Sequence, residues 1–310
     1  ALRDDSLSLK DWFERFAIPS SKAEAFVNAH FNSGFVLVVD EKSDVSKVLE
    51  WSVEAGPDAV CKVLVVVKEG VQNALLLEQL MGRVPLWASL SLVVEQDANA
   101  TVLRLFDLDA DSFVFGSSLV GKDAQLVWSN GFLTTARLLH FASNQLVGEG
   151  AQVTQLDFLF GSDVMGLDLA FSNNHLVPRC FSRCTLQAVM TGASNVVFDG
   201  MIRIYPDAQQ SDALLACHGM LLSKTSSANM IPGLEIQADD VKATHSASVV
   251  HIEDEALFYL RSRGITQAQA KKMLVSGFLD SVVLQLPEAL QEKPLALLEE
   301  KADRLQESGV

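Results

Sequence analysis

The sequence has few of the features that mark disordered, membrane-spanning or disulfide-stabilised proteins. Its 310 residues include only 8 Pro and 18 Gly, and 49% are hydrophobic, which excludes a disordered or collagen-like chain. The longest strand-like apolar run, Val63 to Val67, is far shorter than the roughly 20 residues that a membrane-spanning helix needs. The four Cys are too few and too irregularly spaced for a disulfide framework, so we expect free thiols. A large globular core is predicted.

Positive charge is also scarce. The chain has 24 Lys and Arg against 39 Asp and Glu, a net charge of -15. Because phosphate binding needs clustered Lys and Arg, we expect neither nucleic acid nor an anionic membrane as a partner. The first residues, ALRDDSLSLKDWFERF, carry acids and aromatics where a secretory signal has basic and apolar regions. These features favour a cytoplasmic protein.

Short β-branched runs dominate the middle of the chain, from Val63 to about Val250, and predict many short strands. Helical periodicity is scarce there, and only NALLLEQLM (73–81) shows it. A turn followed by Ala and alternating apolar residues recurs, with its Ala at Ala100, Ala124, Ala151 and Ala193. Such spacing is typical of a stacked β-solenoid or of a long antiparallel sandwich, and spacing alone does not separate the two.

Helical patterns lie toward both ends of the chain. Helices are expected at 8–16 and within SKAEAFVNAHF, after Pro19. Near the other end, DEALFYLRSRG predicts a helix that stops at Gly264, Thr266 and Gln269 form a capping box for a second helix, and a third follows Pro287. We therefore divide the chain into an N-terminal helical or mixed segment (1–60), a β core (61–252) and a C-terminal helical region (253–310).

No standard catalytic or nucleotide-binding motif is present: HExxH, GxxxxGK[ST], GxSxG and a helix-opening GxGxxG are all absent. Soft metal ligands occur in HLVPRCFSRC, with His175, Cys180 and Cys184, and in ACH, with Cys217 and His218. A structural zinc site needs four ligands and usually closer Cys pairs, so the spacing favours structural roles in the first group. The two glycines of VGEGA (147–151) predict a turn.

One long stretch, PGLEIQADDVKATHSASVVHIEDEALFYLRSRGI (232–265), resembles the SufB/SufD family of iron-sulfur cluster assembly proteins, and its SufD branch most closely. The resemblance extends to five shorter segments and covers roughly half of the chain. These segments are VGEGAQV (147–153), HLVPRCFSR (175–183), VFDGMIRI (197–204), LLSK (221–224) and AKKMLVSGF (270–278).

The resemblance implies a mainly β fold, a right-handed parallel β-helix with N-terminal and C-terminal helical segments, and so favours the solenoid over the sandwich. It implies a non-enzymatic scaffold that pairs through its β-helix with a SufB-type chain or with itself. The C-terminal helices are expected to dock a SufC-type ABC ATPase.

The resemblance also implies two site residues. His245 matches the His that the family places at the SufB/SufD interface, where it is implicated in holding iron or a transient iron-sulfur cluster. Cys217 lies 28 residues earlier, near the place where SufB-type members carry a sulfur-accepting thiolate. Cys217 is therefore a candidate ligand or sulfur acceptor, and a small buried thiol is the alternative.

Two other interpretations remain open. A β-helix enzyme acting on acidic polysaccharide would use Asp239, Asp240 and Lys242 in a groove, but neighbouring residues of a strand point to opposite faces, which counts against this pair of acids. A purely architectural SufD-like partner would keep the helices and would not need His245.

Overall fold

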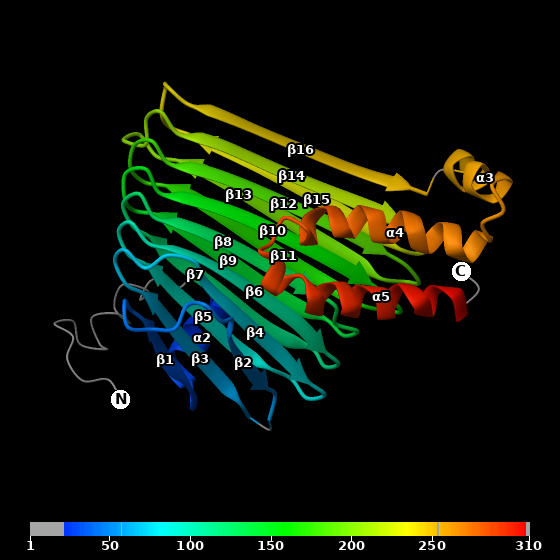
Figure 1. Ribbon diagram of the computed structural model, residues 1–310, viewed down its shortest axis with the longest axis horizontal. Coiled ribbons are helices and arrows are strands. Elements are labelled where there is room, and N and C mark those ends of the chain that lie inside the picture. Colours follow the sequence, from blue (N-terminus) through cyan, green and yellow to red (C-terminus); the bar gives the residue numbers. More distant parts are fainter. Residues whose placement is uncertain (1–21, 57, 253, 308–310) are drawn as a thin grey trace.

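The computed structural model describes residues 22–56, 58–252 and 254–307 (Figure 1). The helix expected at residues 8–16 lies outside these ranges. The described chain confirms the predicted parallel β-helix: it alternates between two eight-stranded sheets in which all neighbouring strands are parallel. Sheet A contains the odd-numbered strands in the order β1 to β15, and sheet B contains the even-numbered strands β2 to β16.

The strands of sheet A are β1 (Ser33–Val39), β3 (Val60–Val67), β5 (Trp87–Val94), β7 (Ser112–Val120), β9 (Leu138–Leu146), β11 (Gly166–His175), β13 (Asn195–Ile204) and β15 (Ser227–Ile236). Those of sheet B are β2 (Leu49–Glu54), β4 (Ala74–Gly82), β6 (Asn99–Leu108), β8 (Gln125–Phe132), β10 (Gln152–Gly161), β12 (Phe181–Met190), β14 (Asp212–Leu221) and β16 (Lys242–His251).

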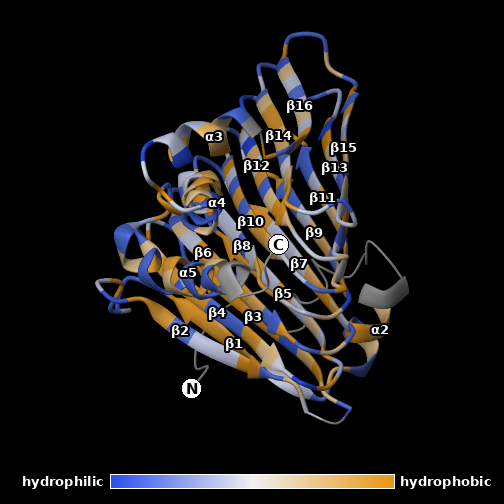
Figure 2. Cartoon of the chain, turned by 90° about the vertical axis from the view of Figure 1, so that its right-hand side faces the viewer, coloured by the Kyte–Doolittle hydropathy of each residue, from blue (hydrophilic) through white to orange (hydrophobic). Residues whose placement is uncertain are grey.

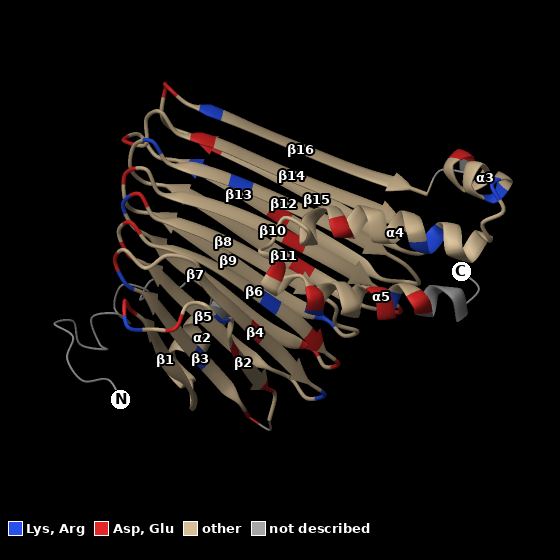
Figure 3. Cartoon of the chain, in the orientation of Figure 1, with Lys and Arg blue, Asp and Glu red and all other residues tan. Residues whose placement is uncertain are grey.

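The main core lies between the two sheets. Alternate residues of each strand point inward, as Val153 and Leu159 do on β10, and join one continuous cluster from Val39 to Ala238. Charged side chains gather at the turns and on the helices, and the strands carry few of them (Figure 3). This separation follows from the period of two in a strand, because one face is buried between the sheets in every coil.

The recurring turn of the sequence has a structural basis. At the corners before β8 and β10, a residue with positive φ, Asp123 or Gly150, is followed by a buried alanine. Asp and Gly tolerate this left-handed conformation better than most residues. Ala98, not Ala100, holds the equivalent place before β6, and Ala193 lies at the opposite corner, where it is exposed.

Two sequence expectations need correction. The segment NALLLEQLM is strand β4 and not a helix, because Leu76 and Leu80 point into the main core while Leu77 is buried on the outer face. A strand that is buried on both faces reads as a nearly continuous apolar run, which can mimic helical periodicity. The solenoid also begins earlier than residue 61, because β1 and β2 lie within the segment 1–60.

Helices cover parts of both sheets. The helix α2 (Lys22–His30) packs on β3 and β5 of sheet A, where its Val27 is fully buried. The helices α4 (Gln267–Val283) and α5 (Glu292–Glu307), joined by the short helix η1 (Glu288–Leu290), lie on the outer face of sheet B (Figures 1 and 2). Leu279 and Val282 of α4 pack there against Phe158 and Val189 in a second apolar cluster.

The predicted helix signals near the C-terminus are confirmed. The helix α3 (Asp254–Ser262) ends just before Gly264, which has a φ of 87°. The capping box of α4 is formed, since Thr266 accepts a hydrogen bond from the backbone N–H of Gln269 and the Gln269 side chain accepts one from the backbone N–H of Thr266. These caps fix the tight joint between α3 and α4.

Candidate functional site at the open end of the solenoid

The C-terminal end of the solenoid is open. β15 and β16 are the last strands of the two sheets, and within the described ranges each pairs with one strand only. None of their residues is buried. At the opposite end the inward residues Val39 and Val53 are buried, and Val45 from the connection between β1 and β2 packs against the core. The two ends of the solenoid therefore differ.

His245 lies on this open end. Its register partner is Leu215 of β14, a buried residue of the inner face, so His245 belongs to the inner face of sheet B. The side chain is nevertheless exposed, because no further strand of the described chain follows β16. An imidazole in this position is accessible to solvent, to iron and to a second protein chain.

Cys217 lies close to His245 but is covered. It sits on the inner face of β14 with 0% exposure, and its register partner is Ala247, two residues beyond His245 on β16. Its thiol donates a hydrogen bond to the carbonyl oxygen of Ser246 over 3.5 Å. Burial raises the pKa of this thiol to about 11. Cys217 is therefore a protonated thiol at neutral pH in this conformation.

A second buried thiol continues the same inner face. Cys184 of β12 pairs with Leu215, and so lies on the strand next to Cys217. Burial first, and then the charges of Asp157 and Cys217, raise the pKa of Cys184 well above its usual value. Sequence reasoning missed this neighbour, because it grouped Cys184 with His175 and Cys180 by spacing along the chain.

His175 and Cys180 have structural surroundings. The Nε2 atom of His175 lies 2.8 Å from the hydroxyl of Ser182, and burial lowers the pKa of His175 to about 4. The Cys180 thiol donates a hydrogen bond to the carbonyl oxygen of Gly148 over 3.6 Å, and burial raises its pKa to about 11. Both residues thus act as buried polar groups that hold the turn between β11 and β12.

The acids of the polysaccharide hypothesis are not on a strand. Asp239 and Asp240 are exposed residues of the turn before β16, and the backbone N–H of Asp240 donates to the side chain of Gln209. The alternation of strand side chains that was expected to separate these two acids therefore does not apply to them. Only Lys242 is in the strand, at its first position.

The site has few candidate metal ligands. Within residues 22–56, 58–252 and 254–307, no group of three or more His, Cys, Asp or Glu side chains could hold a metal ion. The register brings together one exposed imidazole, His245, and one covered thiol, Cys217. His218 is on the outer face of β14, where its Nδ1 atom lies 2.7 Å from the Ser248 hydroxyl.

A helix with exposed aromatic residues follows the open end directly. The helix α3 begins at Asp254, just after β16, and packs on α4. Its Phe258 and Tyr259 are 74% and 59% exposed, which is unusual for large apolar side chains and marks a surface suited to a protein partner. The open strand edge and this aromatic surface therefore lie next to one another in the chain (Figure 1).

A family model described as "SUF system FeS cluster assembly, SufBD core domain" matches residues 51–278. The chain belongs to the SufBD core family. The matched residues run from β2 into α4 and include both Cys217 and His245. Membership in the SufBD core family agrees with the β-solenoid and with the resemblance seen in the sequence.

Several curated relatives share this SufBD core. The iron-sulfur cluster assembly protein SufD of Escherichia coli (strain K12) is 32% identical over 185 residues, which are 59% of this chain and 42% of that protein. An iron-sulfur cluster assembly SufBD family protein of Staphylococcus epidermidis is 25% identical over 202 residues, 64% of this chain and 43% of that protein. A similar protein of Staphylococcus saprophyticus is 26% identical over the same length. The chain thus spans less than half the length of these relatives.

None of the helices in the described ranges combines the length and the apolar character needed to cross a lipid bilayer.

Proposed function

We propose that this chain is a SufD-like scaffold subunit in iron-sulfur cluster assembly, and that it has no catalytic activity of its own. The observation that carries the proposal is the exposed imidazole of His245 on the inner face of β16, the last strand of sheet B, which pairs with β14 on one side only. A neutral imidazole ligates iron, and its protonation releases the metal, so a ligand of this kind suits a cluster that is held only transiently.

The open end supports pairing with a second chain. β15 and β16 present backbone N–H and C=O groups along their free edges, and such edges readily accept another strand. Apolar side chains that are 42% to 46% exposed flank these edges: Ile231, Ile236, Val249 and Val250. In the proposal a SufB-type subunit, or a second copy of this chain, continues the solenoid here and covers them.

Cys217 has a conditional role in this scheme. Iron-sulfur clusters are usually held by four ligands, mostly thiolates, and His245 with Cys217 supplies two at most. The remaining ligands would come from the second chain. Before it can bind iron, the Cys217 thiol must be deprotonated and exposed, since it is buried under β16 and donates a hydrogen bond to the carbonyl oxygen of Ser246. Displacement of β16 on pairing would remove the cover and the burial that raises the pKa, and the thiol proton would then pass to water as iron binds the sulfur.

The C-terminal helices are the proposed docking surface for a SufC-type ATPase. α4 and α5 already bury one face on sheet B, which holds them rigidly in place. Phe258 and Tyr259 of α3 are mostly exposed and would insert into the partner, and the guanidinium of Arg263 lies over the Tyr259 ring at 5.4 Å. ATPase activity belongs to that partner in the proposal.

The test is anaerobic assembly with iron and sulfide in the presence of a SufB-type chain. We expect His245→Ala to lose the visible absorbance of the assembled cluster. His251→Ala is the matched control, because His251 is an exposed imidazole at the end of the same strand. Equal absorbance in the two variants and the unmodified protein would exclude His245 as a ligand.

A purely architectural SufD-like role is the second candidate. It is favoured by the burial of Cys217 and by the lack of a three-ligand group in the described part of the chain. In this case the His245→Ala variant would still support cluster assembly on the SufB-type chain, while variants that block pairing at β15 and β16 would not.

A further inference from the structure

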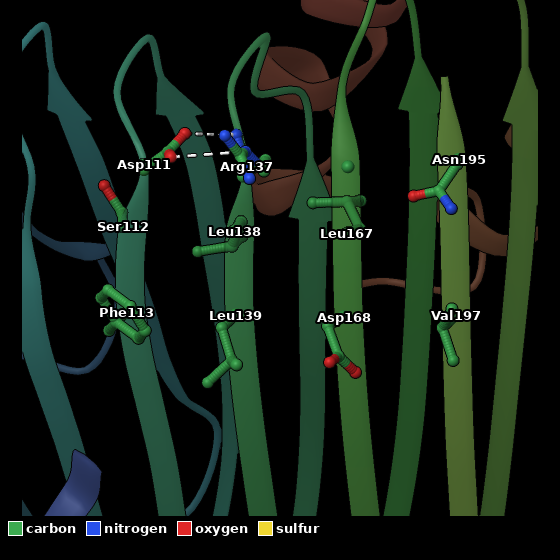
Figure 4. A pocket seen from close by; sticks show the side chains of 11 residues that line it. Asp111, Ser112, Phe113, Arg137, Leu138, Leu139, Leu167, Asp168, Asn195 and Val197 are labelled. Atoms are coloured by element: carbon green, nitrogen blue, oxygen red, sulfur yellow. Dashed lines mark hydrogen bonds and ion pairs between the residues drawn. The ribbon is translucent and has the colours of Figure 1, made fainter. Parts of the chain in front are cut away.

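A groove of about 380 Å³ lies on the outer face of sheet A, from β7 to β13, which is the strand before the last one of this sheet. Its floor is formed by one residue from each of four neighbouring strands: Phe113, Leu139, Asp168 and Val197 (Figure 4). Three of these side chains are apolar, and all four are at least partly accessible to solvent. The groove therefore offers an apolar surface with an acid in its middle.

A glycine keeps the groove open. Arg137 lines one side, where its backbone N–H donates to Asp111 and its guanidinium lies 3.4 Å from the carboxylate of Asp111. Asn195 lines the other side. A side chain at Gly166, between them, would begin 3.3 Å from Arg137 and 3.5 Å from Asn195, and so would fill the space that the groove occupies.

The groove carries uncompensated negative charge. Asp168 of the groove floor and Asp199, which lies just beyond the lining on β13, share the outer face, offset by two residues in the register, and both are exposed. Neither carboxylate has an ion-pair partner in the described part of the chain, while the one cation of the lining, Arg137, is already paired with Asp111. A cationic group placed above the groove would therefore find two free carboxylates.

The groove continues a surface that already binds a helix. Phe26 of α2 packs on Trp87 at 4.9 Å between ring centroids, and Trp87 stacks on Phe113 at 4.2 Å. Phe113 is the first residue of the groove floor, so the contact surface of α2 passes without a break into the groove. Four neighbouring strands span about 14 Å, which is the length of a helix of about nine or ten residues. α2 itself has 9 residues.

We propose that this groove binds a short amphipathic helix of a partner protein, with apolar side chains on Phe113 and Leu139 and with Lys or Arg facing Asp168 and Asp199. The helix would lie beside α2 and cover sheet A much as α4 and α5 cover sheet B. The groove is on the outer face of sheet A, whereas His245 is on the inner face of sheet B, so this inference does not depend on the iron chemistry proposed for His245.

The test uses the full chain and a fluorescein-labelled amphipathic helical peptide with Leu on one face and Lys on the other, and fluorescence anisotropy measures its affinity. We expect the double variant Asp168→Asn/Asp199→Asn to weaken binding about five-fold, as expected for the loss of two exposed ion pairs. Gly166→Leu should weaken binding to a similar extent without a change of charge. The same peptide with Glu in place of Lys should bind far more weakly.

The matched control is Asp97→Asn/Asp123→Asn. This control also removes two negative charges, but from exposed turns at the other end of the strands. Asn tolerates the positive φ of both residues there. An equal loss of affinity in both double variants, or no effect of Gly166→Leu, would show general electrostatic attraction and overturn the proposal. If Trp12→Ala/Phe13→Ala strengthens peptide binding, the chain's own residues 1–21 occupy the groove, and a partner helix is the wrong occupant.

Discussion

The thiol of Cys217 donates a hydrogen bond to the carbonyl oxygen of Ser246 over 3.5 Å, and Ser246 directly follows His245. The two candidate ligands thus sit on adjacent strands of one sheet, one exposed and one covered, and the strand that presents the imidazole is also the cover of the thiol. Any process that moves β16 changes both groups at once.

The first prediction concerns thiol reactivity. In the isolated chain, Cys217 should react with iodoacetamide at neutral pH about a hundred times more slowly than an exposed thiol, because burial raises its pKa to about 11 and blocks access. Mass spectrometry of alkylated peptides measures the rates, with Ser248→Cys on the exposed strand β16 as the reference. Similar rates at the two positions would show that β16 does not cover Cys217 in solution.

The second prediction separates function from stability. His245→Ala should change the free energy of unfolding by less than about 0.5 kcal/mol, because the side chain is exposed. Glu78→Ala should cost about 3 to 5 kcal/mol, since it leaves the buried guanidinium of Arg104 without the carboxylate that now lies 2.5 Å from it. Urea denaturation measures both values. A large loss of stability in His245→Ala would mean that this imidazole has a structural role.

The third prediction concerns Asp157. Burial raises the pKa of this carboxyl to about 7, against hydrogen bonds from Gln155 and Asn130 that lower it. The folded protein therefore holds a proton there between pH 4 and 7 that the unfolded chain releases, so this group lowers stability as the pH rises through that range. Asp157→Asn does not titrate. The stability of the variant relative to the unmodified chain should rise from pH 4 to 7, by up to about 4 kcal/mol, and level off above pH 7.

Denaturation curves at several pH values test this prediction. His175, whose pKa burial lowers to about 4, changes stability in the opposite direction below pH 6.5, but it is present in both proteins and cancels in the comparison. A difference between the two proteins that is independent of pH would show that Asp157 is ionised throughout the range.

The fourth prediction concerns the C-terminal helices. Phe258→Glu/Tyr259→Glu should abolish co-elution with a SufC-type ATPase and leave the thermal unfolding temperature nearly unchanged, because both side chains are mostly exposed. Leu279→Glu is the contrasting variant. It should unfold or strongly destabilise the protein, since Leu279 is 1% exposed and packs against sheet B. Retained co-elution of the double variant would place the ATPase on another surface.

Many elements of the fold could be predicted from local signals, while the choice of the solenoid over the sandwich came from the resemblance to the SufB/SufD family. The turn residues with positive φ, the β-branched runs and the capping box of Thr266 each depend on nearby residues, and the structure contains all three. The local patterns gave a wrong prediction for β4, because burial on both faces removed the alternation of polar and apolar residues. They also missed β1, whose first residues are exposed, so no long buried run marks the start of the solenoid.

The candidate site could be predicted only in part. His245 was identified by resemblance, but its exposure on an inner face depends on β16 being the last strand, which no single segment reveals. The proximity of Cys184 to Cys217 depends on the lengths of the turns between β12 and β14, because these lengths set the register of the coils. The pairing of strands between coils depends on residues far apart in the chain, so local sequence patterns do not predict which residues lie next to each other.

The parallel register has a consequence for how such a protein can change in size. Within the two sheets each coil contacts mainly the coils before and after it, so one complete coil could be inserted or removed without altering the strand pairing of the first or the last coil. The helices α4 and α5, which pack across the middle coils of sheet B, would then have to shift. Each added coil would carry the imidazole about 4.8 Å farther from the N-terminal face. The number of coils thus sets the distance between the N-terminal face of the solenoid and the strand that carries His245.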